Sequence, residues 1–198
     1  MADPSQAGSC WQLDTLSDCR LAIGRYPVFR YNATGGSATT SRTDSPTESP
    51  TAAQSTPLHF AAEQICIPSL NWQTTRFLGL PLPPGLQINI QPQLLQGGLD
   101  PADGSMVLCF KARFQFQVIA GKRLLYQAPD LHVATQLSTE RVQGRRHVAQ
   151  GKALDHSGEA SLVGVATIPC SGEAWLDRFL GLPDEALAVL HCRLNRVA

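Results

Sequence analysis

The chain has 198 residues, which is enough for one domain to bury a hydrophobic core without disulfides or metals. Charged residues make up only 16%, against roughly 25% in typical soluble domains, so uncharged polar residues must supply much of the surface polarity. Sixteen basic side chains balance sixteen acidic ones, and this balance gives no support to a nucleic-acid partner or to a general attraction to anionic membranes.

The N-terminal third of the chain changes composition twice. Residues 19–31 have apolar and aromatic side chains at nearly alternate positions, which predicts an edge strand because Pro27 cannot donate to a ladder. Half of residues 34–57 are Ser or Thr, and none is aromatic, which predicts a disordered linker. We therefore expect an N-terminal segment (1–33) with one possible strand, a linker (34–57) and a sheet-and-helix domain (58–198).

The next segments alternate in type. Residues 58–67 and 86–91 read as strands that end at prolines, and residues 69–78 predict a short helix with Ser69 as its N-cap. The most regular pattern lies in residues 107–119, whose even positions are apolar and whose odd positions between 111 and 117 are polar. This is the period of a strand with one wet face, so the sheet should be built around it. The apolar positions are Leu108, Phe110, Ala112, Phe114, Phe116 and Val118.

Short turns separate the apolar segments between residues 120 and 168, which favours an antiparallel meander over parallel units with crossover helices. The spacing then changes to that of helices. Residues 173–182 carry one apolar stripe, and residues 184–198 carry a second, with acidic residues in the first turn and arginines in the last. The sequence therefore predicts a C-terminal helix after the sheet.

One hexapeptide occurs twice. Arg-Phe-Leu-Gly-Leu-Pro stands at residues 76–81 and again at 178–183, with Trp72 and Trp175 upstream of the two copies. The simpler interpretation is that both copies end helices, because Gly suits the left-handed cap and Pro prevents continuation. The alternative is that two helices face each other across one cavity.

Chemical motifs are weak throughout. The five histidines are scattered without the spacing of metal ligands, the glycine pairs lack the context of a phosphate loop, and no cofactor is predicted. His191 and Cys192 are neighbours, but on a helix they would point about 100° apart and would not form a catalytic dyad.

Cysteine usage and the chain start indicate a reducing compartment. The six cysteines include no closely spaced pair, and Cys66, Cys109 and Cys170 lie in or beside apolar runs, where we expect small buried thiols. No export signal and no apolar run of about 18 residues is visible, so we expect a cytoplasmic protein without a transmembrane segment.

These elements together predict an α+β fold, in which a curved antiparallel sheet of about six or seven strands packs against a C-terminal helix in a helix-grip arrangement. The strand at 58–68, the Phe-Leu-Gly-Leu-Pro helix, the stretch from 154 to 168 and the last amphipathic helix resemble uncharacterised helix-grip proteins of cyanobacteria and plastids. The resemblance covers about 140 residues by pattern, and Pro183 departs from it by splitting the closing helix. It implies no active site.

The leading functional hypothesis is a non-enzymatic binding protein for an apolar small molecule such as a lipid or pigment, or, if the resemblance holds, a photosynthesis-related assembly factor. The alternatives are a small hydrolase or isomerase in the same cavity, which would need titratable groups there, and a module that docks a protein partner through an edge strand or helix. The candidate cavity-lining residues are Trp72, Phe77, Phe110, Phe114, Phe116, Trp175 and Phe179.

Overall fold

The computed structural model describes residues 10–40 and 55–197. This part of the chain forms a 13-stranded antiparallel sheet, a separate two-stranded hairpin (β12 and β13), one α-helix and a short 3-10 helix. The elements are β1 (Cys10–Thr15), β2 (Cys19–Ile23), β3 (Phe29–Tyr31), β4 (Ser37–Thr39), β5 (Thr56–Phe60), η1 (Ala62–Gln64), β6 (Thr75–Phe77), β7 (Leu80–Pro81), β8 (Leu86–Leu99), β9 (Met106–Ala120), β10 (Arg123–Gln127), β11 (Leu131–Ser138), β12 (Arg141–Gln143), β13 (Val148–Gln150), β14 (Glu159–Ile168), α1 (Ala174–Leu180) and β15 (Asp184–Val197).

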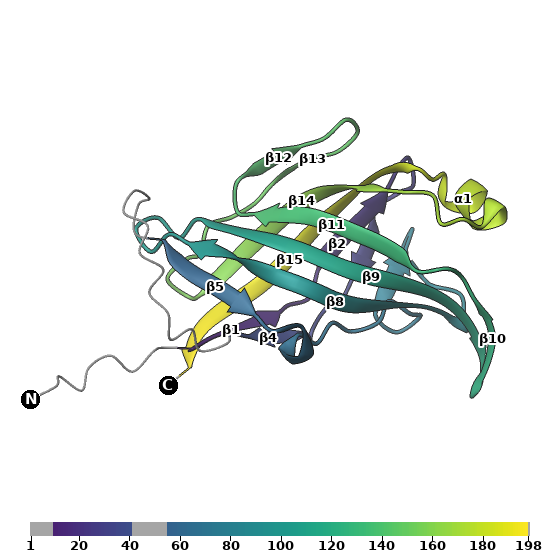
Figure 1. Cartoon of the computed structure of the whole chain (residues 1–198), viewed down its shortest axis with the longest axis horizontal. Helices are drawn as coiled ribbons and strands as arrows, with labels where there is room; N and C mark the ends of the chain where they lie inside the picture. The colour runs from purple at the N-terminus through teal and green to yellow at the C-terminus, as the bar shows by residue number, and fades with distance from the viewer. Residues whose placement is uncertain (1–9, 41–54, 198) are drawn as a thin grey trace, which may run out of the picture.

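Five long strands form the body of the sheet, in the order β8, β9, β11, β14 and β15 (Figure 1). The last strand has two neighbours on its far side: residues 186–189 pair with β2, and residues 192–197 pair with β1. β4 then pairs with β1, and Thr40 bridges to Phe60 at the opposite edge of the sheet. Near the β6–β7 edge of the sheet, Leu70 bridges to Ile88 in β8. The sheet therefore curves until its two edges meet around an interior.

The alternation predicted for residues 107–119 is present in β9. Leu108, Ala112 and Phe116 are buried, whereas Cys109 and Lys111 between them are exposed. β9 is paired along most of its length, with β8 on one side and β11 and β10 on the other. The α+β class and the antiparallel sheet are confirmed, but the sheet has about twice the expected number of strands.

The predicted C-terminal helix is wrong, because Asp184–Val197 is strand β15. It pairs with β14 over ten residue pairs, from Glu159 opposite Arg193 to Ile168 opposite Asp184. Its apolar residues are so frequent that they satisfy the helical period and the strand period together. Ladders on both sides decide for the strand, since they satisfy the backbone and bury it. The helix-grip arrangement is therefore not confirmed.

The predicted helix at residues 69–78 is also wrong. Residues 71–74 form a turn in which the Asn71 side chain accepts hydrogen bonds from the amides of Gln73 and Thr74. β6 and β7 follow as a hairpin, with Phe77 opposite Leu80. The first copy of the hexapeptide therefore ends no helix. The second copy does, because Gly181 takes the left-handed cap of α1 (φ 70°).

The N-terminal segment contributes strands β1, β2 and β3 to the large sheet. The expected single edge strand at 19–31 is two strands, β2 and β3, with Pro27 in the turn between them, and β2 lies inside the sheet. Of the expected linker, residues 37–39 form β4 with Ala38 buried, and β5 begins at Thr56. Residues 41–54 lie outside the described residues. That residues 58–198 fold as a unit by themselves stays a prediction.

Candidate functional site

The interior of the curved sheet contains a cavity of about 250 Å³. Its wall is almost entirely aliphatic and aromatic, and it draws on nearly all of the long strands together with β1 to β4 and the segment before β6. The central strand contributes Phe110, Phe114 and Phe116, and the strands β8, β11, β14 and β15 contribute Ile88, Ile90, Leu131, Val133, Ala166, Ile168 and Leu190.

Three hydroxyl groups in the wall are bonded to backbone carbonyls. The Thr15 hydroxyl donates to the carbonyl of Ala33 at 2.5 Å, and the Thr135 hydroxyl donates to that of Val165 at 2.9 Å. The Tyr31 hydroxyl donates to the Pro68 carbonyl, and burial raises the pKa of this phenol. Because these donors are already used, the wall offers an occupant apolar contact and little else.

The three predicted phenylalanines of β9 line this cavity. The other four candidates do not. Trp72, Trp175 and Phe179 are about half exposed on the outside, and Phe77 stacks on Phe29 with ring centroids 4.6 Å apart. The prediction that they line the cavity requires two facing helices, and the first of these segments is a turn and a hairpin instead.

Sequence reasoning missed the opposite half of the wall, which comes from β1, β2 and β15. Leu13 and Cys19 are buried there, and Leu190 also lines the wall. The alternating pattern at 19–23 was a usable signal, but nothing in it says that β2 would lie beside β15 across from β9. That relation follows from long-range pairing.

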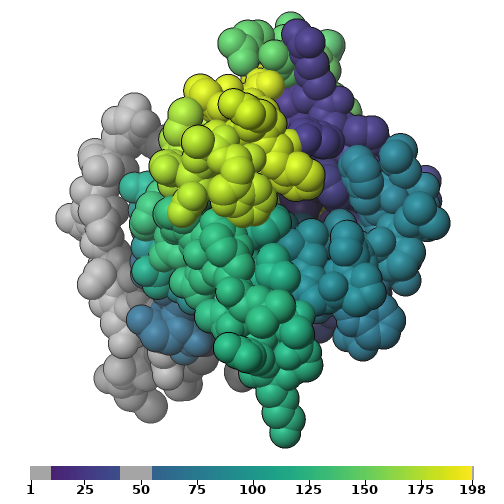
Figure 2. Space-filling view, turned by 90° about the vertical axis from the view of Figure 1, so that its right-hand side faces the viewer, coloured from purple at the N-terminus to yellow at the C-terminus, as the bar shows by residue number. Residues whose placement is uncertain are grey.

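One end of the cavity is covered by α1. Leu176 is fully buried against Phe116 and Ala128, and Leu180 lines the cavity. The Tyr26 hydroxyl, from the turn between β2 and β3, donates to the Phe179 carbonyl. Figure 2 views this end, where α1, the β2–β3 turn, the β6–β7 hairpin and β10 surround the end of the sheet. The cover is thus one short helix held by a buried leucine and a tyrosine.

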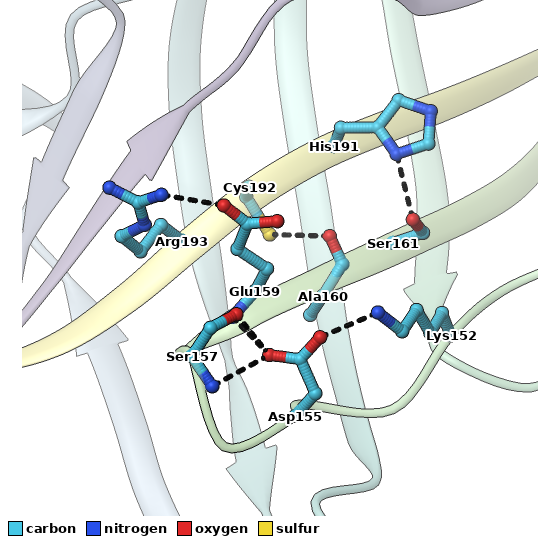
Figure 3. A network of polar contacts seen from close by, with 9 residues as sticks. All are labelled: Lys152, Asp155, Ser157, Glu159, Ala160, Ser161, His191, Cys192 and Arg193. Atoms are coloured by element: carbon cyan, nitrogen blue, oxygen red, sulfur yellow. Dashed lines mark hydrogen bonds and ion pairs between the residues drawn. The ribbon is translucent and has the colours of Figure 1, made fainter.

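A polar network lies on the outer side of β14 and β15 (Figure 3). Ser161 is opposite His191, and its hydroxyl lies 2.7 Å from the imidazole Nδ1. Both residues have the opposite parity to Leu162 and Leu190, which face the interior. Among the described residues no carboxylate bonds to the His191 ring, so the third member of a catalytic triad is missing from the pair.

The rest of this network is structural. Asp155 accepts hydrogen bonds from the Ser157 amide at 2.9 Å and the Glu159 amide at 3.1 Å, and pairs with Lys152 at 2.5 Å. The Lys152 and Ser157 bonds hold the pKa of Asp155 well below its usual range. Arg193 pairs across the strands with Glu159 at 2.5 Å. These contacts fix the turn that leads into β14, as the Asp-His-Ser-Gly sequence predicts.

The first two residues of β15 anchor the loop between β12 and β13. The Glu185 carboxylate accepts hydrogen bonds from the amides of Arg145, Arg146 and His147 at 2.6 to 3.0 Å. Burial raises the pKa of Glu185, but these amides outweigh it and the net shift is downward. Asp184 forms an ion pair with Arg146 at 2.8 Å. The hydrogen bond from the Glu185 amide and the bond from the Arg146 guanidinium together lower the pKa of Asp184 to about 2.

The thiols do not form a reactive site. Cys19 and Cys192 are buried, and burial raises both pKa values, that of Cys192 to about 12. Cys66, Cys109 and Cys170 are exposed, so the prediction that they are buried is wrong. In the part of the chain that the structure describes, no group of three His, Cys, Asp or Glu side chains is placed to hold a metal ion.

In residues 10–40 and 55–197 no helix has the length and apolarity needed to cross a membrane. The chain has no significant match among protein-family models, curated proteins or solved structures.

Proposed function

We propose that the chain is a non-enzymatic binding protein that holds an apolar small molecule in the central cavity. The observation that carries the proposal is a cavity of about 250 Å³ whose wall is apolar and whose buried hydroxyls are bonded to backbone. An engineered apolar cavity of about 150 Å³ already stays dry and takes up benzene. A larger one with the same chemistry favours an apolar guest for the same reason.

The size of the cavity also narrows the class of ligand. Its volume is slightly below the range of about 300 to 1,000 Å³ that is usual for sites of drug-sized molecules. A flexible acyl chain or another slender apolar group can enter such a space and leave a polar head outside. Among the classes considered, we therefore favour a lipid over a bulky pigment.

The alternative of a hydrolase or isomerase in the same cavity has less support. General acid–base chemistry needs titratable groups inside the pocket with pKa values near the working pH. The titratable residues in the wall are Cys19, Tyr31 and Cys66, and burial raises the pKa values of Cys19 and Tyr31, away from neutrality. Binding without chemistry is the function that this wall favours.

The proposal is tested by titrating a fluorescent apolar probe into the purified protein. Phe114→Trp adds volume inside the cavity, so we expect it to weaken probe binding by about tenfold or more. Lys111→Trp places the same side chain on the outward face of the same strand and should leave binding unchanged. Absence of probe binding by the unmodified protein, or equal loss in both variants, would contradict the proposal.

The natural ligand can be sought by native mass spectrometry of protein purified from its own host. We expect a species heavier than the chain, which loses its extra mass under denaturing conditions. The Phe114→Trp variant, purified in the same way, should carry less of that mass.

A further inference from the structure

The covered end of the cavity carries an unusual concentration of exposed apolar side chains. We call this surface the apolar rim, and its main residues are Trp72, Leu78, Leu80, Leu125, Trp175 and Phe179. Leu78 and Leu80 are each 70% exposed, and Leu125 is 57% exposed. Single exposed leucines need no explanation, but a patch of leucines and aromatics marks an interaction surface.

Aromatic contacts join the segments that carry the rim. The Tyr26 ring lies 6.3 Å from that of Phe179 in α1 and 6.5 Å from that of Phe77 in β6. Trp175 in α1 lies 5.4 Å from Tyr126 in β10. α1, the β2–β3 turn, the β6–β7 hairpin and β10 therefore form one surface, the end that faces the viewer in Figure 2.

The same segments carry more basic than acidic side chains. Arg25, Arg76, Lys122, Arg123 and Arg178 lie in or next to them, and none of these takes part in a salt bridge within the described residues. The acidic residues of α1 and its cap are Glu173 and Asp177, and Asp177 is bonded to Ser171. Asp184, which lines the recess between α1 and the β2–β3 turn, is paired with Arg146. Basic side chains therefore outnumber acidic ones at this end, although the net charge of the chain is zero.

We propose that the apolar rim docks on the surface of a membrane that contains anionic lipids. Aromatic and leucine side chains flanked by Lys and Arg are the combination that binds the headgroup region, the apolar groups by insertion and the cations by attraction to anionic headgroups. The rim side chains stand on separate turns, a hairpin and a short helix, so each can enter a fluid layer independently. A rigid protein partner would need a matching pocket for each of them.

Docking at this end places the lipid next to the thinnest cover of the cavity. Leu180 lines the cavity from inside, and it also lines an open recess on the outside together with Arg25, Tyr26 and Pro27. Leu180 therefore separates the cavity from the outer recess. Its role as an entrance for a lipid rests on the proposed function, whereas the docking itself does not require that the cavity be filled.

The docking is tested by co-sedimentation of the protein with phosphatidylcholine vesicles, prepared with and without phosphatidylglycerol. We expect binding that needs the anionic lipid and weakens as salt is raised, because salt screens the attraction. Lys122→Glu combined with Arg123→Glu should lower the partition coefficient at least about tenfold, since each basic residue near an anionic surface contributes roughly fivefold.

Trp175→Ser combined with Phe179→Ser removes the apolar part of the rim on α1 and should also weaken binding by about tenfold or more. The matched controls are Val148→Ser and Arg141→Glu, which change an exposed valine and an exposed arginine on the β12–β13 hairpin. Both should bind vesicles like the unmodified protein. All of these side chains are at least about half exposed, and thermal unfolding will show that each variant is folded.

Three results would overturn the docking proposal: no binding to anionic vesicles, equal losses in the controls, or self-association without lipid that the Trp175→Ser and Phe179→Ser changes abolish. The last would make the rim a contact between copies. The two proposals fail separately. Phe114→Trp should keep vesicle binding while losing the apolar probe, and the rim variants should keep the probe in the absence of vesicles.

Discussion

The two copies of Arg-Phe-Leu-Gly-Leu-Pro adopt different structures in one molecule. Residues 76–81 form the β6–β7 hairpin, with Leu78 and Gly79 as its two-residue turn, whereas residues 178–183 form the end of α1 and its cap. The glycines behave alike, with φ of 82° at Gly79 and 70° at Gly181. The leucines before them do not, because Leu78 has φ of 52° and Leu180 is helical.

The surroundings explain the difference. In the first copy Phe77 pairs with Phe29, so a strand is already present to accept it. In the second copy the Ser171 amide and hydroxyl both donate to the Asp177 carboxylate at 2.6 Å, and Leu176 is buried beneath the helix. The six residues therefore fix the conformation of the glycine, and contacts outside them choose between strand and helix.

The largest effect is expected two residues before each copy, where Leu176 corresponds to Thr74. Leu176→Ala removes a fully buried side chain and should lower the free energy of unfolding by about 2 to 5 kcal/mol. Thr74→Ala removes the hydroxyl that donates to the Ser69 carbonyl at 2.7 Å and should cost about 1 kcal/mol. Chemical denaturation of the two variants measures both. Equal costs would mean that α1 is not anchored by its buried leucine.

The leucines before the two glycines should respond with opposite signs to the same change. Leu78→Asn creates an Asn-Gly turn, which suits two residues at positive φ, and should stabilise the protein by roughly 0.5 to 1 kcal/mol. Leu180→Asn places a polar group in the cavity wall and should destabilise it by about 1.5 to 3 kcal/mol. Thermal unfolding distinguishes them, and a loss of stability in both would refute the turn assigned to the first copy.

The glycines themselves should respond alike. Gly79→Ala and Gly181→Ala each force a side chain into the left-handed region, where the added Cβ meets no other atom, so each should cost about 1 kcal/mol. Gly98→Ala is the control, because its φ is not positive and its Cβ would make only ordinary contacts with Ser55 and Thr56. A neutral Gly181→Ala variant would contradict the cap of α1.

The smallest effect concerns pH and the residue after the second copy. The Glu185 amide and the Arg146 side chain hold the pKa of Asp184 at about 2, below the ordinary value of 3.8. A lowered folded-state pKa stabilises the protein above the ordinary pKa, and this contribution is lost as pH falls from about 4 through about 2. Asp184→Asn should therefore flatten the fall in the unfolding midpoint over that window. Glu63→Gln, at an exposed site, should leave it unchanged.

Features that depend on neighbouring residues could be predicted from the sequence. Alternation in residues 107–119 specified β9 and the inward side of Phe110, Phe114 and Phe116. The short polar turns specified antiparallel connections, and Gly181 specified the end of α1. In each case the signal is a local period or a conformational preference of one residue, and both are visible within a few positions of the chain.

Features that depend on distant partners could not be predicted from the sequence, because they follow from long-range strand pairing. Asp184–Val197 fits a helix by its spacing, and it is a strand because β14 lies on one side of it and β1 and β2 lie on the other. The same pairing brings the N-terminal strands to the cavity wall opposite β9, whereas Trp72, Trp175 and Phe179 are exposed on the apolar rim. A chain segment carries its own period, but not the identity of the segment that will satisfy its backbone hydrogen bonds, and that choice decides what is inside.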